Sequence, residues 1–156
     1  MIRFGALLAA SAALCQPAWA SDLYLVCLGA GSANRQQSSS AYLRDNYGNS
    51  AWGQVVGTRT VPFDDQVNVE IVGEEARIRM PRTMLPPLHG GEDGWMKVKK
   101  LEINEREITG SVAVNFINSP KLRIDRMTGT ISLNGKSGDY SGRCQSYDPS
   151  TAKPQF

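Results

Sequence analysis

The sequence has very little of what catalytic and metal sites are made of. It contains one histidine, His89, and three cysteines, and no two cysteines have the Cys-x-x-Cys spacing of redox and zinc sites. A zinc site needs three or four ligands, mostly of imidazole or thiolate character, which this chain does not supply. No acid–base pair and no nucleophile beside a base can be recognised either. We therefore expect a protein that is not an enzyme and that has no cofactor and no metal.

The chain also lacks a large excess of positive or negative charge, and it has no long hydrophobic run. The formal net charge is +2 at pH 7, so the chain offers no electrostatic basis for binding nucleic acid or an acidic membrane. The dense basic run at residues 97–100 is interleaved with apolar residues, as on the exposed face of a strand. An apolar run at residues 4–14 is far shorter than the roughly 20 residues of a membrane-spanning helix. We expect a protein that is not integral to a membrane.

That short apolar run instead forms the centre of a signal peptide. Arg3 precedes the run, Pro17 ends it, and small residues mark a cleavage site after Ala20. Residues 1–20 are predicted to be removed, which leaves residues 21–156 as a single β domain that is periplasmic or secreted.

The cysteines fit an exported chain. Cys15 lies in the signal peptide, where Leu14 replaces the small residue that normally precedes a lipidated cysteine, so we do not expect a lipoprotein. Cys27 and Cys144 remain, and an isolated pair in an oxidising compartment predicts a disulfide. The bond would join the first strand to the last, and closing so long a loop stabilises a fold by roughly 4–5 kcal/mol in the chain-entropy model.

Alternation of apolar and polar residues dominates the rest of the chain. It runs through residues 67–71, 76–80 and 108–116, whereas no stretch carries a helical stripe over three turns. In residues 96–103 the apolar parity changes once, which predicts a β-bulge near Lys99 and Lys100. Short links carry turn residues, so we expect an all-β antiparallel meander that closes as a barrel or a sandwich.

The last three strands can be placed in register. Pairing Ile124 with Ile131 and Leu133 with Tyr140 keeps the apolar residues on one face and sets Gly129 opposite Cys144. The same registers put three outward residues in a row, namely Asp125, Thr130 and Arg143. We interpret this segment as a sheet held by a disulfide and not as an active site.

Two segments lack the alternating pattern that is typical of strands. Residues 29–40 are polar and small, and we expect a mobile loop there, because no lysine or helix follows to make a phosphate-binding loop. Residues 41–44 and 51–60 then form a hairpin around a turn at 45–50.

The second segment, residues 81–94, is the longest well-defined loop and our candidate for recognition. It holds His89, Glu92 and Asp93, with Trp95 and Trp52 as candidate flanking aromatics. The alternative is that the apolar residues of the loop plug an open end of the barrel, namely Met84, Leu85 and Leu88. Both roles can coexist.

The chain resembles a family of small exported proteobacterial proteins without an established function. The matching pieces are YLVCLGAGSA, DNYGNSAWG, PFDDQVNVEI, RIRMPRTMLPPLHGGEDGW, VNFINSPKL and IDRMTGTISLNGKSGDYSGRC. The resemblance covers nearly the whole mature chain. It implies export and a single disulfide-linked β domain, and it brings no catalytic or binding residues.

A second comparison is with the periplasmic lysozyme inhibitors, which are small, exported, eight-stranded and disulfide-bonded. Only SGDY at residues 137–140 matches part of their C-terminal motif, and the segment expected after it is missing. From the sequence we expect a monomeric, non-enzymatic envelope protein that binds another envelope protein or a small ligand as a binding or accessory module. An inhibitor or ligand binder of the lysozyme-inhibitor type is the alternative.

Overall fold

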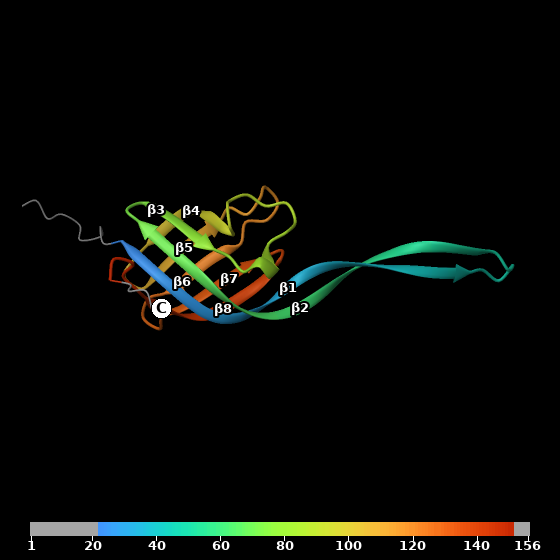
Figure 1. The fold of residues 1–156 in the computed structure, drawn as a ribbon, viewed down its shortest axis with the longest axis horizontal. Coiled ribbons are helices and arrows are strands. Elements are labelled where there is room, and N and C mark those ends of the chain that lie inside the picture. The colour runs from blue at the N-terminus through green and yellow to red at the C-terminus, as the bar shows by residue number, and fades with distance from the viewer. Residues whose placement is uncertain (1–21, 152–156) are drawn as a thin grey trace, which may run out of the picture.

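The computed structural model describes residues 22–151 and shows a closed barrel of eight antiparallel strands with a long hairpin projecting from it (Figure 1). Each strand pairs with the next along the chain, and the last pairs with the first. The predicted signal peptide, residues 1–20 with Cys15, lies outside the described residues. The elements are β1 (Leu23–Arg44), β2 (Ser50–Val72), β3 (Glu75–Arg79), the 3-10 helix η1 (Arg82–Met84), β4 (Trp95–Ile103), β5 (Glu107–Val112), β6 (Lys121–Asp125), β7 (Thr130–Gly135) and β8 (Gly138–Ser146).

Alternation along the strands builds the core, as the sequence predicts. Successive side chains of a strand point to opposite faces, so one parity of each strand enters the barrel. The inward set forms one apolar cluster to which β1 to β8 all contribute. Its largest fully buried members are Tyr140, Ile78, Met84, Met96, Ile108, Leu122, Ile131 and Leu133.

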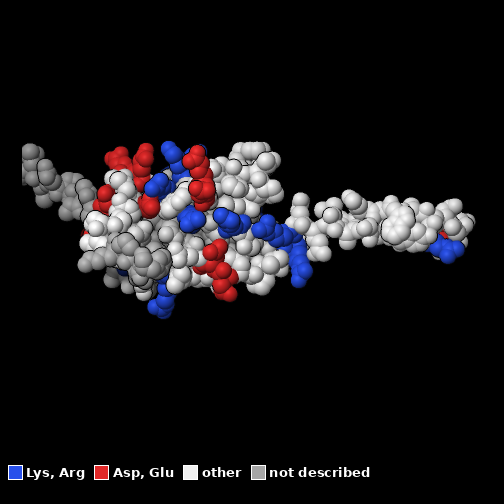
Figure 2. Space-filling view, viewed as in Figure 1, with Lys and Arg blue, Asp and Glu red and all other residues white. Residues whose placement is uncertain are grey.

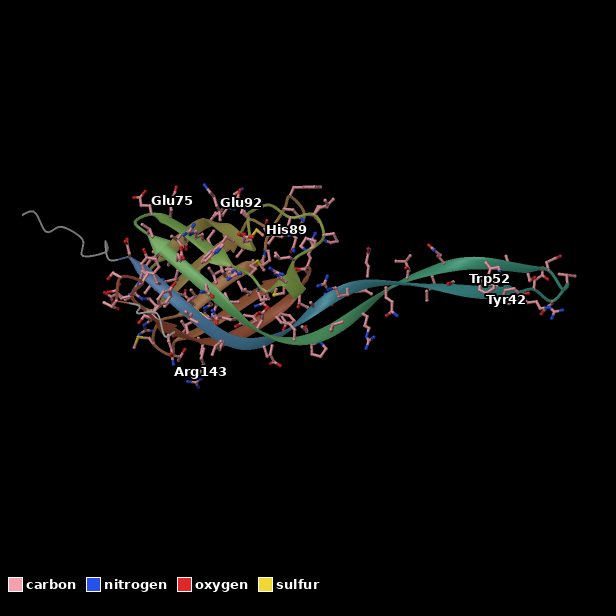
Figure 3. All side chains as sticks on the ribbon, viewed as in Figure 1. Tyr42, Trp52, Glu75, His89, Glu92 and Arg143 are labelled. Carbon is pink, nitrogen blue, oxygen red and sulfur yellow. A yellow bond between two sulfur atoms is a disulfide. The ribbon has the colours of Figure 1, made fainter. Side chains whose placement is uncertain are left out.

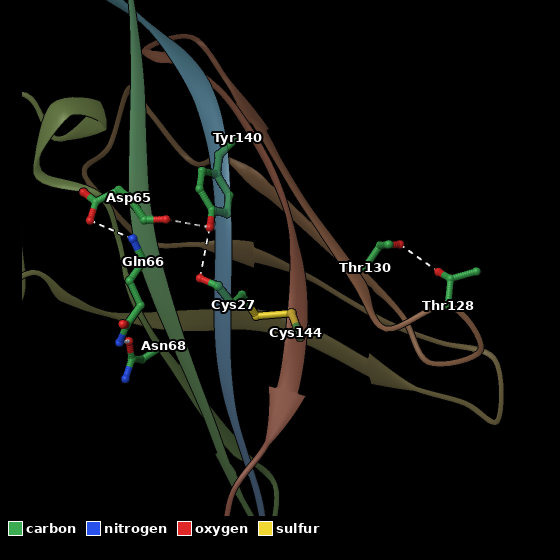
Figure 4. Close-up of a disulfide and its surroundings, with 8 residues drawn as sticks. All are labelled: Cys27, Asp65, Gln66, Asn68, Thr128, Thr130, Tyr140 and Cys144. Carbon is green, nitrogen blue, oxygen red and sulfur yellow. Dashed lines mark hydrogen bonds between the residues drawn. A yellow bond between two sulfur atoms is a disulfide. The ribbon is translucent and has the colours of Figure 1, made fainter.

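A disulfide closes the barrel where the first strand meets the last (Figure 4). Cys27 of β1 lies directly opposite Cys144 of β8, with their Cα atoms 3.9 Å apart. The side chain of Cys27 is fully buried. The predicted pairing is therefore confirmed.

Tyr140 spans the interior beside this bond. Its hydroxyl lies 3.1 Å from the backbone oxygens of both Cys27 and Asp65, and it donates its single proton between them. Its ring stacks on Phe63, with centroids 6.3 Å apart. Burial, reinforced by the charge of Asp65, raises the pKa of Tyr140 to about 12. One side chain thus ties together the three strands β1, β2 and β8.

The registers predicted for the last strands are confirmed. Ile124 pairs with Ile131, and Leu133 pairs with Tyr140. The amide of Cys144 donates to the carbonyl of Gly129 at 2.7 Å, and Gly129 has the left-handed φ of 65° that this turn requires.

The predicted bulge in β4 is also present. The pairing of β4 with β5 shifts between Lys99 and Glu102, and Lys100 has a φ of 51°. As a result Leu101 packs against the core although its parity differs from that of Met96, whereas Ile103 stays partly exposed.

The strand predicted at residues 108–116 is too long. β5 ends at Val112, because the Asn115 carboxamide oxygen accepts the amides of Ile117 and Asn118 and turns the chain away. Val114 is still buried, but Phe116 is almost fully exposed.

The loop predicted at residues 29–40 is wrong, because this segment continues β1 without a break. At Gly29 and Gly31 the strand crosses the backbone of β8 so closely that a Cβ at either position would collide with it. Beyond Asn34 the strand leaves the barrel and pairs only with β2. Neither face of that part is buried, so its sequence lacks the alternation that marks a strand.

Candidate functional site

The most prominent feature outside the barrel is the arm, residues 34–60, which is the part of the β1–β2 hairpin that projects into solvent (Figure 1). β1 and β2 have 22 and 23 residues, well beyond the roughly 3–10 residues of an ordinary strand. Each strand of the arm extends about 35 Å at roughly 3.3 Å per residue. The hairpin predicted at residues 41–44 and 51–60 is confirmed, but its first strand starts much earlier than predicted and runs the full length of the arm.

The base of the arm is held to the barrel by Asn34. Its amide donates to the carbonyl of Ser137 at 2.9 Å, and its carboxamide nitrogen donates to the carbonyl of Lys136 at 3.3 Å. The hydroxyl of Thr60 donates to its carboxamide oxygen at 3.1 Å. These bonds tie both strands of the arm to the β7–β8 turn and set the direction in which the arm leaves.

Asp45 organises the tip. Its carboxylate accepts the amides of Tyr47 and Asn49 at 2.9 and 2.8 Å, and the carboxamide nitrogen of Asn49 at 2.9 Å. The side-chain bond from Asn49 is the main cause that lowers the pKa of Asp45. With Gly48 at a φ of 86°, this network fixes a tight turn with a charged carboxylate at its end.

The arm has two faces. Successive side chains of each strand point to opposite faces, and residues directly opposite each other in the ladder point to the same face. The inner face continues the interior parity of the barrel and consists of Arg35, Gln37, Ser39, Ala41, Leu43, Ala51, Gly53, Val55, Gly57 and Arg59. The outer face continues the exterior parity and consists of Gln36, Ser38, Ser40, Tyr42, Arg44, Ser50, Trp52, Gln54, Val56 and Thr58.

An aromatic pair stands on the outer face near the tip (Figure 3). The rings of Tyr42 and Trp52 lie 5.2 Å apart and are tilted by 60°. Tyr42 is 54% exposed and Trp52 is 76% exposed. The two rings pack on each other and on no part of the core, with Ser40 and Gln54 beside them as hydrogen-bonding groups.

Charge is unevenly distributed over the arm. Figure 2 shows acidic and basic atoms over the barrel, whereas the arm is almost uncharged between a basic base and its tip. At the base, Arg35 lies directly opposite Arg59 on the inner face, a like-charge pairing that destabilises a ladder. In the part of the chain that the structure describes, neither arginine makes an ion pair.

The two halves of the loop at residues 81–94 differ in burial. Met84 and Leu85 are buried in the core, and η1 lies against β1 at the end of the barrel where the arm begins (Figure 1). Leu88 is exposed, so two of the three apolar residues predicted to plug the barrel do so.

The predicted recognition residues of this loop lie on its exposed half. His89 and Glu92 are both exposed (Figure 3), and the Nδ1 atom of His89 lies 2.9 Å from the carbonyl oxygen of Gly90. Asp93 is exposed at a φ of 51°, and its carbonyl accepts a bond from the Arg79 side chain at 3.3 Å. The structure therefore brings these residues to one surface without joining their side chains to each other.

The two tryptophans predicted to flank the loop behave differently. Trp95 is half-buried at the start of β4, and the guanidinium of Arg77 lies over its ring at 4.9 Å. Trp52 stands far out on the arm (Figure 3), so its predicted place beside the loop is wrong. The reason is the unrecognised length of β1 and β2, which carries Trp52 away from the barrel.

The outward row in the last strands lines a shallow depression together with Leu28 and Arg123. As predicted, Asp125 and Arg143 flank Thr130 across three strands. The Asp125 carboxylate accepts the amides of Met127 and Thr128 at 2.9 Å, and the bond from Thr128 is the main cause that lowers its pKa. The carboxylate of Asp125 is therefore used in the turn between β6 and β7.

No protein-family model matches the chain, and no curated protein or solved structure is significantly similar to it. The resemblance to a family of exported proteins thus stays a prediction. Within residues 22–151 no group of three or more His, Cys, Asp or Glu side chains is placed to hold a metal ion. The described residues include no helix with the length and hydropathy needed to cross a membrane.

Proposed function

We propose that the protein is an exported, non-enzymatic binding module of the cell envelope, and that the outer face of its arm is the recognition surface. The observation that carries this proposal is the exposed pair of Tyr42 and Trp52 at the end of a projecting hairpin. Aromatic side chains are enriched at protein interfaces and dominate their binding energy. Here they contribute nothing to the core of their own chain.

The shape of the arm favours a macromolecular partner over a small ligand. Small molecules bind in concave pockets that bury most of their surface, whereas the arm is a ribbon open on both faces and along both edges. Its uncharged middle, with Gln54 and Ser40 beside the aromatic pair, suits a partner that offers a flat or grooved surface with hydrogen-bonding groups. We take the partner to be another envelope protein.

A projecting arm also suits insertion into a cleft of another protein. This geometry keeps an inhibitor of the lysozyme-inhibitor type as a second candidate, in which the tip around Tyr42 and Trp52 would enter the substrate cleft. The exposed half of the loop, with His89, Glu92 and Asp93, is the rival recognition surface on the barrel.

A capture experiment separates these possibilities. The immobilised chain is exposed to envelope extract and, separately, to purified lysozymes, and the bound proteins are identified. The double variant Tyr42→Ala, Trp52→Ala should lose the specific partner, since truncating a central aromatic commonly costs about 2 kcal/mol or more, which is over tenfold in affinity. Phe116→Ala removes an aromatic that is at least as exposed but lies in the loop between β5 and β6, away from the arm, and it should bind as the wild type does.

Substitutions in the loop at residues 81–94 provide the complementary test. If alanine at His89, Glu92 and Asp93 abolishes capture while the double aromatic variant retains it, recognition belongs to the loop and the proposal fails. Turnover on peptidoglycan, ester, phosphate or glycoside substrates that is lost on a surface substitution would refute the non-enzymatic role.

A further inference from the structure

We propose that two copies of this chain associate through the inner faces of their arms. The arms pack face to face and antiparallel, so that the tip of each lies over the base of the other. The outer faces with Tyr42 and Trp52 then remain open on both sides of the dimer. This inference concerns the face opposite to the proposed recognition surface and does not depend on the identity of any partner.

The first support is the exposed apolar surface of the inner face. Leu43 is 64% exposed and Val55 is 54% exposed, Ala51 lies directly opposite Leu43, and Ala41 follows Leu43 on the same face. The interior parity of the barrel continues onto this face, but no core covers it. A two-stranded ribbon alone is marginally stable in water, so an arm of this length gains most from a surface that packs on it.

Gly53 and Gly57 give a second support, because nothing within the chain requires them. A Cβ at either position would meet no atom within 4 Å, and neither has a positive φ. Glycine weakens a strand, and in a strand interior it often marks the close approach of another backbone. Gly29 and Gly31 of β1 show such an approach inside the barrel, against β8. On the inner face of the arm the approaching backbone must come from outside.

The distribution of charge along the arm favours antiparallel over parallel packing of two copies. A dyad through the middle pair, Ser39 and Val55, brings the base of one arm over the tip of the other. Arg35 and Arg59 then lie over Leu43 and Ala51 of the second copy and can extend toward Asp45, which is ionised and lies just beyond the last ladder pair. Arg44 at the same tip belongs to the outer face. The parallel arrangement would instead gather four arginines at one end.

The available area is sufficient for such a dimer. Each inner face measures about 35 Å by about 10 Å at ordinary strand spacings. Stacking two of them with their side chains removes on the order of 1,000 Å² in total, at the low end of specific interfaces. We therefore expect a reversible dimer whose population rises with concentration and which weakens at high salt.

The first test uses neighbouring valines on opposite faces. The mass of the full-length chain in solution is measured by light scattering and sedimentation from micromolar concentration upward. Val55→Glu places a charge at the centre of the interface and should raise the dissociation constant roughly tenfold or more. Val56→Glu, the matched change on the outer face, should leave it unchanged, and neither touches the core.

The second test uses the three consecutive serines. In a Cys15→Ser background, Ser39→Cys lies next to the dyad and should be cross-linked between chains by a short bis-maleimide, because stacked sheets lie about 10 Å apart, which is too far for a direct disulfide. Ser38→Cys and Ser40→Cys are equally exposed but point outward, so they should stay monomeric under the same conditions.

Three results would overturn the inference. They are a wild-type chain that is monomeric throughout the concentration range, equal cross-linking from Ser38, Ser39 and Ser40, or a dimer lost in Val56→Glu and kept in Val55→Glu. If the wild type is monomeric and Val55→Glu abolishes partner capture, the inner face binds the partner and not a second copy of the chain. The proposed function and the dimer can therefore fail separately.

Discussion

The barrel and the arm are made from the same two strands in one unbroken register, yet they obey different rules. In the barrel, β1 is paired on both sides, and its inward residues, such as Leu25 and Cys27, enter a closed core. In the arm the same strand is paired on one side only, and both faces meet solvent. Strand pairing alone therefore does not determine stability here, since burial on a second surface supplies most of it.

Glycine makes the same contrast visible within one hairpin. Gly31 in the barrel section is required by the backbone of β8, whereas Gly57 in the arm lies in open space. One glycine is explained by the fold and the other points to a surface that the single chain does not cover. The difference separates a glycine that the packing of the barrel requires from one that no contact within the chain requires.

The largest effect should come from the disulfide that closes the barrel section of β1. Changing both Cys27 and Cys144 to alanine should lower the free energy of unfolding by about 2–5 kcal/mol, because the denatured chain loses its longest constraint. Urea denaturation measures the change, and Cys15→Ser is the control because it leaves the bonded pair intact. If intact mass shows two free thiols at Cys27 and Cys144 before reduction, the bond is absent and this prediction is wrong.

A matched pair of leucines tests the contrast between the two regions directly. Leu133→Ala empties a fully buried position of the barrel and should cost about 2–5 kcal/mol through lost burial and a residual cavity. Leu43→Ala makes the identical change on the arm and should alter the stability of a dilute sample by less than about 0.5 kcal/mol. Equal costs in the two variants would mean that the arm packs on something in the isolated chain.

Tyr140 offers a smaller effect with a distinctive pH dependence. Tyr140→Phe leaves the carbonyls of Cys27 and Asp65 without their donor and should cost about 1–2 kcal/mol at neutral pH. The folded pKa of about 12 lies above the ordinary value of 10.0, so the folded chain retains the phenolic proton more strongly than the unfolded chain. This contribution is complete below pH 10 and is lost as pH rises from 10 through 12.

The measurement for Tyr140 is the free energy of unfolding between pH 8 and 12 in wild type and in Tyr140→Phe. The difference between the two chains should shrink above pH 10, since only the wild type carries this group. Tyr42→Phe on the exposed arm is the control and should follow the wild type at every pH. A constant difference across the range would refute the role of Tyr140 ionisation.

These regions also differ in how far they could be predicted from the sequence. Alternation and turn residues predicted the barrel strands, the bulge at Lys100 and the registers around Ile131, because one buried face constrains every second residue. The arm has no buried face, so the polar run before Ala41 was predicted to be a loop. A loop at residues 81–94 was predicted and is present, with the short helix η1 inside it. Trp52 was placed wrongly, because its position depends on the length of β1 and β2.

A usable signal for the arm was nevertheless present. In the structure the hairpin pairs Tyr42 with Trp52, one residue away from the register that the predicted bounds imply, and the same register followed back along both strands sets Cys27 opposite Val67. Both of those residues face the core, so the register observed in the arm agrees with the parity predicted in the barrel. Continuity of register across a polar segment can thus reveal a strand that hydrophobic periodicity misses.

Removing the arm altogether should also change the stability of the barrel very little. A chain in which Asn34 is joined to Thr60 through Asn-Gly keeps the paired residues at the base and the bonds from Asn34 to the β7–β8 turn. Because the deleted residues bury nothing in the core, the free energy of unfolding of the barrel should change by less than about 1 kcal/mol. Partner capture and dimer formation should both disappear.

The sign of that small change distinguishes two pictures of the isolated arm. If the arm is a formed hairpin, its removal is close to neutral. If it unfolds locally in the monomer, it acts as a long flexible connection, and shortening it should stabilise the barrel by roughly 1–2 kcal/mol through loop-closure entropy. A loss of more than about 2 kcal/mol would show that the arm supports the barrel, and the division of this molecule into a stable barrel and a binding arm would be wrong.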